Sequence, residues 1–438
     1  MSAAQEVQLA GAAAPYRGLF AEPWARWLAL ADVCARLPQG MVGITLLLVT
    51  ARHASMTVAG LVVAGYTLAQ AATGPLRGRL ADRRGLVPAA ALCTLGYALT
   101  LLALLAAASA GLLIATAVAA GLLNPPLSPG MRNLWSLNAG DLLKQTAFAL
   151  DAAVFDLAYI TGPVLASGLA TGLSPAVALF VMLVLTGTAV ITIAAAAPGS
   201  ARSRHADLPV RPAAPRRMPA PLRSRVFRKL LVTAALTNAA LSATEVALTA
   251  YARHHHALWA SGPLLAGVSV GSILGSLLLG ARAPKSSQGH DRRLVRLLTG
   301  YACGLAILTA AGLFGPLLAV AAPLAGLCLG PTLATLFGAA AATAPRGSGT
   351  ETQAWVNSIM NGGAAAGAVI AAFAAARPVL ALGLASAMAA LATLSAAHGR
   401  PRRGWSARTA ARSGKREAGP GRGGPSAGDG GPCRQEVR

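Results

Sequence analysis

The chain has 438 residues, of which 55% are hydrophobic and only 12% are charged. Soluble domains carry about 25% charged residues, so this composition excludes a soluble globular protein. The net charge of +23 raises nucleic-acid binding as an alternative, but the basic residues lie between apolar runs rather than on one basic face, which favours a membrane protein.

Apolar runs bounded by glycine, proline and charge predict a series of membrane-spanning helices in the first half of the chain. The pair Pro125 and Pro126 interrupts the fourth run near its end. The helices expected in this half are Leu28–Val49, Met56–Pro75, Leu86–Ala106, Gly111–Leu127, Ala147–Ala170 and Pro175–Ala196.

The second half of the chain continues the pattern after a polar stretch. Its expected helices are Leu230–Tyr251, Leu258–Leu279, Leu294–Phe314, Leu317–Ala341, Ala354–Ala376 and Pro378–Ala397. Gly78 near the end of the second helix has a counterpart in Gly280 near the end of the eighth, about 200 residues later. Such spacing is typical of two halves related by an axis along the membrane normal.

The predicted fold is therefore an all-α integral membrane protein, with about twelve transmembrane helices in two pseudo-symmetric six-helix bundles. The expected domains are an N-terminal half at 1–198, a Pro/Arg-rich cytoplasmic linker at 199–228, a C-terminal half at 229–398 and a disordered basic tail at 399–438.

The distribution of charge predicts how the helices are oriented. Lysine and arginine gather in the N-terminal segment, in alternate loops that include Arg77 and Arg132, in the linker and in the tail, whereas the other side receives only Arg52, Arg253 and Arg377. Because basic residues stay in the cytoplasm, both termini are predicted to be cytoplasmic in a multi-pass protein of the inner cell membrane.

No cofactor and no metal site are predicted. The five cysteines are scattered without a CxxC pair, and those beside apolar spans are typical of small buried hydrophobes. The three consecutive histidines 254–256 lie in an outer loop, where adjacent side chains point apart rather than toward one metal ion.

The segment after the second expected helix is Gly78-Arg79-Leu80-Ala81-Asp82-Arg83-Arg84-Gly85. It resembles the signature loop of the major facilitator superfamily, although the basic pair that follows in that family is missing. The resemblance implies a conformational latch formed by Gly78, Asp82, Arg83 and Gly85. Asp82 can cap the N-terminus of a neighbouring helix, and the arginines can pair with acids across the two bundles.

The fifth expected helix contains Gly162 and Pro163. This pair is similar to the Gly-Pro motif on the fifth helix of the superfamily's proton-coupled antiporters, with a partial match at its closing positions. A packing kink is the alternative interpretation, because proline is tolerated in membrane helices wherever neighbours satisfy the freed backbone groups.

Two polar stripes are expected to face the interior, because a charge that faces lipid is costly. At helical spacing, Asp32, Arg36 and Gln39 share one face of the first helix, and Asn238, Ser242 and Glu245 share one face of the seventh. All six are candidates for a substrate or proton pathway. For Asp32 and Arg36, an ion pair one helical turn apart that neutralises itself is the alternative.

Glu245 and Asp156 are the candidate proton carriers, because neither has a cation within reach on its own helix. Asp151 lies nearer the cytoplasm and is expected to pair with arginines of the loops. A carboxyl group without a partner that moves between dry and wet surroundings can take up and release a proton.

The expected function is secondary active transport of a small molecule, with protons as coupling partner and the lipid bilayer as environment. No nucleotide-binding loop of the Gly-x-x-x-x-Gly-Lys type occurs in the sequence. Proton-coupled efflux of a drug-like or secondary-metabolite compound is the leading hypothesis, and a monomer is expected. The alternatives are an importer or facilitator of sugars or other nutrients, and a membrane-embedded enzyme.

Overall fold

The computed structural model of the protein describes residues 14–52, 54–140, 143–196, 221–281 and 290–398. Within these ranges every regular element is helical, and twelve spans are long and apolar enough to cross a membrane. The prediction of an all-α membrane protein is therefore confirmed. The tail 399–438 and most of the linker 199–228 lie outside the described residues.

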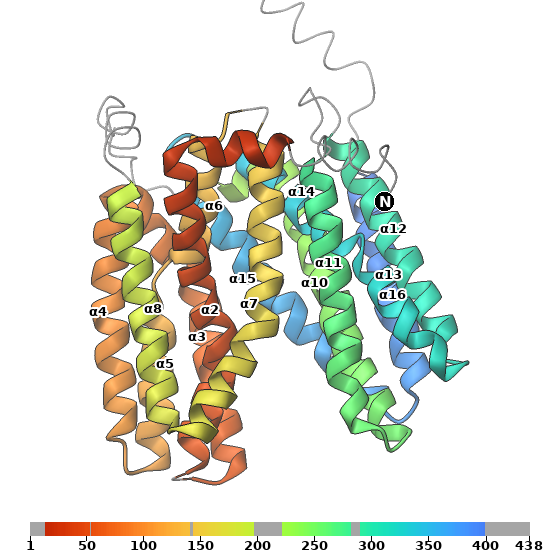
Figure 1. Cartoon of the computed structure of the whole chain (residues 1–438), viewed down its shortest axis with the longest axis horizontal. Helices are drawn as coiled ribbons and strands as arrows, with labels where there is room; N and C mark the ends of the chain where they lie inside the picture. The colour runs from red at the N-terminus through yellow and green to blue at the C-terminus, as the bar shows by residue number, and fades with distance from the viewer. Residues whose placement is uncertain (1–13, 53, 141–142, 197–220, 282–289, 399–438) are drawn as a thin grey trace, which may run out of the picture. The chain divides into compact units, whose positions relative to one another are not determined.

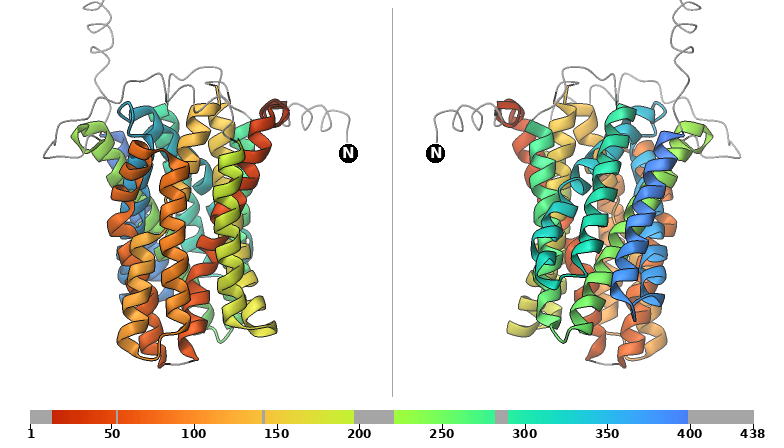
Figure 2. Two further views of the ribbon diagram at one scale, coloured as in Figure 1. Left: turned by 90° about the vertical axis from the view of Figure 1, so that its left-hand side faces the viewer. Right: turned by 90° about the vertical axis from the view of Figure 1, so that its right-hand side faces the viewer.

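The helices of the first half form the N-terminal helix group, coloured red to yellow-green in Figure 1. Both views in Figure 2 show these helices running in nearly the same direction, as a set of membrane spans requires. The group comprises α2 (Pro23–Ala51), α3 (Met56–Arg84), α4 (Leu86–Leu105), α5 (Ala110–Leu123), α6 (Leu127–Asn138), α7 (Lys144–Gly172) and α8 (Pro175–Ala196).

The helices of the second half form the C-terminal helix group, coloured green to blue beside the first in Figure 1. Its first helix begins at Arg225, a little before the expected boundary at 229. The group comprises α10 (Arg225–His254), α11 (Ser261–Ala281), α12 (His290–Ala311), α13 (Leu318–Gly326), α14 (Leu329–Thr343), α15 (Gly349–Phe373) and α16 (Pro378–Ala397), with short 3-10 turns at Pro221–Arg223, Leu258–Ala260 and Gly315–Leu317.

The fourth span differs from the sequence prediction. Its expected end at Leu127 is wrong, because the chain breaks at Asn124 and the two prolines and then resumes as α6 to Asn138. Proline cannot donate to the helix before it, but its fixed backbone angle suits a helix start. Arg132, which was assigned to a cytoplasmic loop, therefore lies within a helix of the fourth span.

The latch motif also lies in a helix and not in a loop. Helix α3 continues past Pro75 through Asp82 to Arg84, and the chain turns at a single residue, Gly85, with φ of 91°. This left-handed conformation is open to glycine but costly for other residues. Gly85 thus makes the turn, and the rest of the motif presents its side chains from the last two turns of α3.

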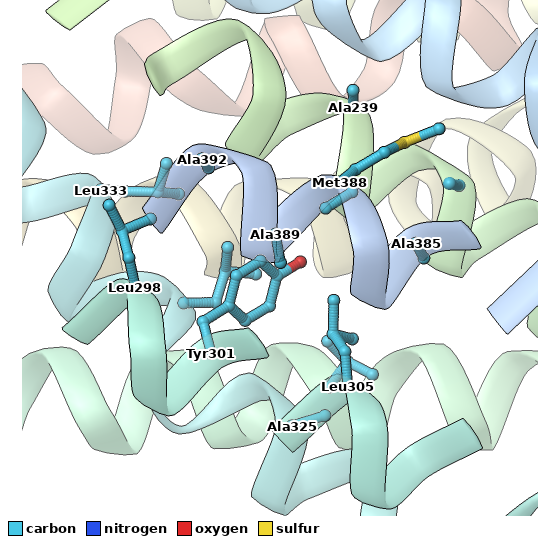
Figure 3. Packing of buried hydrophobic residues seen from close by; sticks show 14 of the residues in the cluster. Ala239, Leu298, Tyr301, Leu305, Ala325, Leu333, Ala385, Met388, Ala389 and Ala392 are labelled. Carbon is cyan, nitrogen blue, oxygen red and sulfur yellow. The ribbon is translucent and has the colours of Figure 1, made fainter. Parts of the chain in front are cut away.

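Close helix packing depends on small residues, as is usual inside a bilayer. A Cβ atom added to Gly271 of α11 or to Gly326 of α13 would lie 2.0 or 1.9 Å from a backbone oxygen of the other helix. In the core of the C-terminal group, Leu298 and Tyr301 of α12 lie near Ala389 of α16 (Figure 3).

Candidate functional site

The two helix groups meet where α3 and α11 end and where α7 and α15 begin. We call this the Asp82 end. Asp82 accepts hydrogen bonds from the backbone N–H groups of Thr350 and Glu351, at 2.9 and 2.8 Å, in the first turn of α15. These donors have no partner within their own helix, and the positive end of the helix dipole favours a carboxylate there. The capping contact that the motif predicts is therefore present.

The arginines of the motif have different surroundings. Arg79 forms an ion pair with Glu351 across the two helix groups at 2.6 Å, whereas Arg83 is exposed to solvent. Gly78 allows the close approach of the two helices, because a Cβ atom at that position would lie 2.9 Å from the Cα atom of Glu351 and 2.9 Å from the Cβ atom of Ala354. Substitution of Gly78 would push α3 away from α15.

We expect Asp82→Ala to shift the protein away from the conformation in which the Asp82 end is closed, and thereby to slow transport. Loss of the helix cap costs about 1–2 kcal/mol, which changes the ratio of the two states by a factor of about 5–30. Double electron–electron resonance between spin labels at the exposed positions Arg84 and Arg346 measures the change as a longer distance.

The exposed Arg83→Ala variant is the matched control and should keep the distance distribution of the parent protein. If Asp82→Ala also keeps that distribution and transports at the parent rate, Asp82 has no part in the conformational cycle.

The pseudo-symmetric contact between α11 and α7 uses neutral groups. The Thr146 hydroxyl of α7 donates to the Gly280 carbonyl of α11 at 2.9 Å. Beside this contact, the hydroxyl of Tyr16, which precedes α2, donates to the Leu277 carbonyl of α11 at 2.9 Å. A Cβ atom on Gly280 would lie 2.8 Å from that of Ala149, as Gly78 lies against Ala354 on the other side. Among the described residues, a carboxylate caps a helix in the contact between α3 and α15, but none does so in the contact between α11 and α7.

A buried charge cluster lies inside the N-terminal group, made of Asp32, Arg36, Arg132 and Asp151, whose side chains are 1% exposed or less. Arg36 Nε donates to Asp32 at 2.9 Å and Arg36 also bonds Asp151. Arg132 Nε donates to the other oxygen of Asp151 at 3.2 Å. The formal charges cancel, which makes the cluster tolerable within the bilayer.

Two interpretations of these residues from the sequence are corrected by the cluster. Asp32 and Arg36 do not form a self-contained pair, since Arg36 bridges to Asp151, and Asp32 also accepts from Trp135 Nε1 at 3.3 Å. Asp151 does not pair with loop arginines, because both of its partners lie on helices α2 and α6. The side chains meet only through tertiary packing, which helical spacing within one helix does not reveal.

The cluster contacts the other helix group through an aromatic ring. The Arg132 guanidinium lies 3.5 Å from the ring centroid of Phe337 on α14. Its Nη1 and Nη2 atoms have no hydrogen-bond acceptor among the described residues. The face of an aromatic ring attracts a cation, so this contact helps to hold the two groups together near the Asp82 end.

Asp156 lies deeper in the same interface between the groups. Its carboxyl group accepts a hydrogen bond from the Ser272 hydroxyl of α11 at 2.5 Å. The side chain is buried, and it forms no ion pair with any described residue. Asp156 is thus a buried carboxyl group whose one hydrogen-bond partner among the described residues belongs to the opposite helix group.

The polar stripe of α10 is divided between two environments. Asn238 donates to the Met360 carbonyl of α15 at 2.8 Å, a contact within the C-terminal group. Glu245 is exposed and accepts from the Ser242 hydroxyl at 3.3 Å. Like Asp156, Glu245 has no cation partner in the part of the chain that the structure describes.

Gln39, Gly162 and Pro163 complete the predicted residues. Gln39 lines a small cavity between the helix groups. Gly162 of α7 lies against Gly40 of α2, with an added Cβ atom 2.7 Å from the Cα atom of Gly40. This close crossing gives Gly162 a packing role within the N-terminal group, and Pro163 follows it inside the continuous helix α7.

Arg77 and Arg132 are the functional candidates that the sequence analysis missed. The charge pattern of the sequence predicts that both lie in cytoplasmic loops, yet both side chains are buried in the structure. The sequence holds a signal that Arg132 is buried, because apolar residues lie on both sides of it, up to Trp135. For Arg77, the sequence holds no comparable signal, because its partners and the cavity are formed by distant segments.

Comparisons with known proteins agree with this arrangement. Residues 28–368 match the sequence profile described as Major Facilitator Superfamily. The human organic anion transporter MFSD10 (TETRAN) is similar in structure, with a TM-score of 0.67 and 15% identity over 85% of this chain and 98% of that one. A bacterial homologue of the iron transporter ferroportin, in an outward-facing state, is also similar in structure. Its TM-score is 0.66, and the two sequences are 14% identical over 85% of this chain and 98% of that one. No curated protein sequence matches the chain.

Proposed function

Because the chain belongs to the major facilitator superfamily and is a membrane transporter, we propose that it couples proton movement to the export of a small drug-like or secondary-metabolite compound. Asp156 carries this proposal. A buried carboxyl group that is bonded to the opposite helix group changes its surroundings whenever the two groups move apart. A change in surroundings changes proton affinity, which is the requirement for coupling.

Alternating access supplies the movement in this proposal. Two polar contacts between the helix groups, Arg79 with Glu351 and Thr146 with Gly280, lie toward the Asp82 end. If the Asp82 end is cytoplasmic, the structure corresponds to a state closed to the cytoplasm. Separation of these contacts would then open the pathway inward, with α3 moving against α15 and α7 against α11.

The pathway residues that we propose are Asp156 and Glu245 for protons and Gln39, Asn238 and Ser242 for the substrate. Asp32 and Arg36 support the pathway from the buried charge cluster. The conformational latch consists of Gly78, Asp82 and Gly85, with Arg83 as its exposed neighbour, and Gly162 and Pro163 shape α7. We also propose that the protein acts as a monomer, because the two helix groups between which the proposed pathway runs belong to the same chain.

Flux through proteoliposomes tests this function. Purified protein is reconstituted, and a panel of anionic, neutral and cationic amphipathic compounds is offered with and without a pH gradient. We expect one class to accumulate against its gradient only when the pH gradient is imposed. Flux of nutrients that ignores the pH gradient would favour the importer or facilitator instead, and absence of any flux would contradict a transporter role.

Labelling with a membrane-impermeant thiol reagent tests the proposed orientation. In a cysteine-free background, His255→Cys should react from outside intact cells, and Arg346→Cys should react only after the membrane is opened, because both positions are exposed at opposite helix ends. The positive-inside rule sets this expectation. Reaction of both positions from the same side would contradict the proposed topology, with both termini cytoplasmic.

A further inference from the structure

A small cavity lies between the two helix groups, away from the proposed proton carriers. It has a volume of about 20 Å³ and is lined from the N-terminal group by Gln39, Gln70, Arg77 and Ser128, and from the C-terminal group by Asn357 and Ser358. This volume admits about one water-sized group. Neither aspartate nor glutamate is among its lining residues.

Arg77 is the one charged residue of the cavity lining. Its side chain is only 8% exposed, and it forms no ion pair with any residue in the described ranges. The guanidinium donates to the carbonyls of Asn124 and Gln70, while its Nε atom is buried without an acceptor. A buried cation without a counter-ion is costly, so the cavity presents an uncompensated positive charge.

The neutral groups around Arg77 are also available to a ligand. The side chains of Gln39, Asn357 and Ser358 line the cavity, and each is only partly buried. Amide N–H₂ and hydroxyl groups donate hydrogen bonds to anions, and guanidinium binds carboxylate or sulfonate oxygens through parallel N–H groups. Charge and donors thus converge from both helix groups on a space that holds one small polar group.

From this arrangement we propose that Arg77 and the polar groups around it bind an anionic group of the transported compound. The proposal rests on the transport function above and assigns its substrate class: an organic anion such as a carboxylate or sulfonate. The anion site on α3 and α15 is separate from the proton site, because Asp156 binds across α7 and α11. Substrate and proton therefore do not compete for the same side chains.

The position of the site between the groups makes its affinity depend on conformation. Gly74 brings α3 against α15, since a Cβ atom there would lie 2.6 Å from the Ser358 hydroxyl oxygen. Arg77 and Asn357 share the cavity only while these helices are in contact. When the groups separate at the Asp82 end, the donors from α15 leave Arg77, and the anion is held less tightly.

Binding to the full-length protein in lipid nanodiscs tests the proposal. Isothermal titration calorimetry compares benzoate and benzenesulfonate with neutral benzamide and cationic benzylammonium, and includes nitrate and sulfate as inorganic anions. We expect the organic anions to bind and Arg77→Gln to weaken their binding by about tenfold or more, since a charge-assisted contact is lost. Arg83→Gln removes an exposed charge from the same helix and should leave binding unchanged.

A second variant decides the question if Arg77→Gln fails to fold. Asn357→Asp supplies a carboxylate from the opposite helix group and should occupy Arg77, reducing anion binding while Arg77 remains in place. Unchanged anion binding in Arg77→Gln or Asn357→Asp, or preferential binding of benzylammonium or benzamide, would overturn the proposal and leave Arg77 as a cap for the broken fourth span. Binding of inorganic anions alone would contradict the organic substrate class. The transport function itself is tested separately, by pH-driven flux through the parent protein, so failure of the anion site and failure of the transport function give different results.

Discussion

In proteoliposomes, Asp156→Asn is expected to abolish accumulation of substrate driven by a pH gradient, while exchange of substrate for substrate continues. Asp156 is buried and bonded to Ser272 of the opposite helix group at 2.5 Å. In the proposed cycle this bond breaks when the groups move apart, and the carboxyl group then binds protons differently in the two environments. Asparagine keeps the size and the hydrogen bond but cannot carry a proton.

Glu245→Gln is expected to behave in the same way if Glu245 is the coupling carboxyl group. Glu245 lies on the membrane-spanning helix α10, and its side chain is bonded to the Ser242 hydroxyl of the same helix. Ser272→Ala is the matched control: it removes the bond to Asp156 but retains the carboxyl group, and should reduce the rate without abolishing the response to pH. If both single carboxyl variants still drive uphill transport, the coupling site lies elsewhere.

Arg36→Met is expected to have the largest effect on stability. The substitution leaves the carboxylates of Asp32 and Asp151 inside the N-terminal group with only Arg132 to compensate them. Breaking a buried ion pair by removing one partner costs about 3–5 kcal/mol. Thermal unfolding in detergent, followed by fluorescence-detected size exclusion, should show a large fall in the midpoint temperature or a loss of folded protein.

The double variant Asp32→Leu with Arg36→Met distinguishes unpaired charge from lost packing. It removes one cation and one anion, and leaves Arg132 and Asp151 paired at 3.2 Å. Replacement of a whole buried pair by apolar groups is often neutral, so the double variant should recover most of the lost stability. Equal loss in the single and double variants would show that packing, and not charge balance, sets the stability of this region.

The spans and the capping contact of Asp82 could be predicted because each depends on local sequence. Apolar length determines which segments cross a bilayer, and the described residues contain twelve helices long and apolar enough to do so, as expected. The capping role of Asp82 followed from a motif whose residues lie within a few positions of each other. The helical course of that motif was missed because Gly78 and Pro75 suggested an early end, whereas a single turn at Gly85 is sufficient.

The contacts between helices could not be predicted, because they depend on the arrangement of distant segments. Arg36 and Asp151 are 115 positions apart, and their pairing requires the packing of α2 against α7. The Pro125-Pro126 break concealed α6 and with it Arg132. In the sequence, Arg77 is one of the basic residues that predict which side of the membrane is cytoplasmic. Its ligand-binding interpretation comes from the cavity between α3 and α15.

Proton movement that accompanies substrate movement is the most direct test of the proposed mechanism. Proteoliposomes that contain the protein and an internal pH-sensitive dye are given substrate at equal pH on both sides. We predict that the substrate gradient drives protons across the membrane in the opposite direction, and that the proton signal is lost in Asp156→Asn or in Glu245→Gln. Substrate flux with no proton signal in the parent protein would contradict proton-coupled exchange.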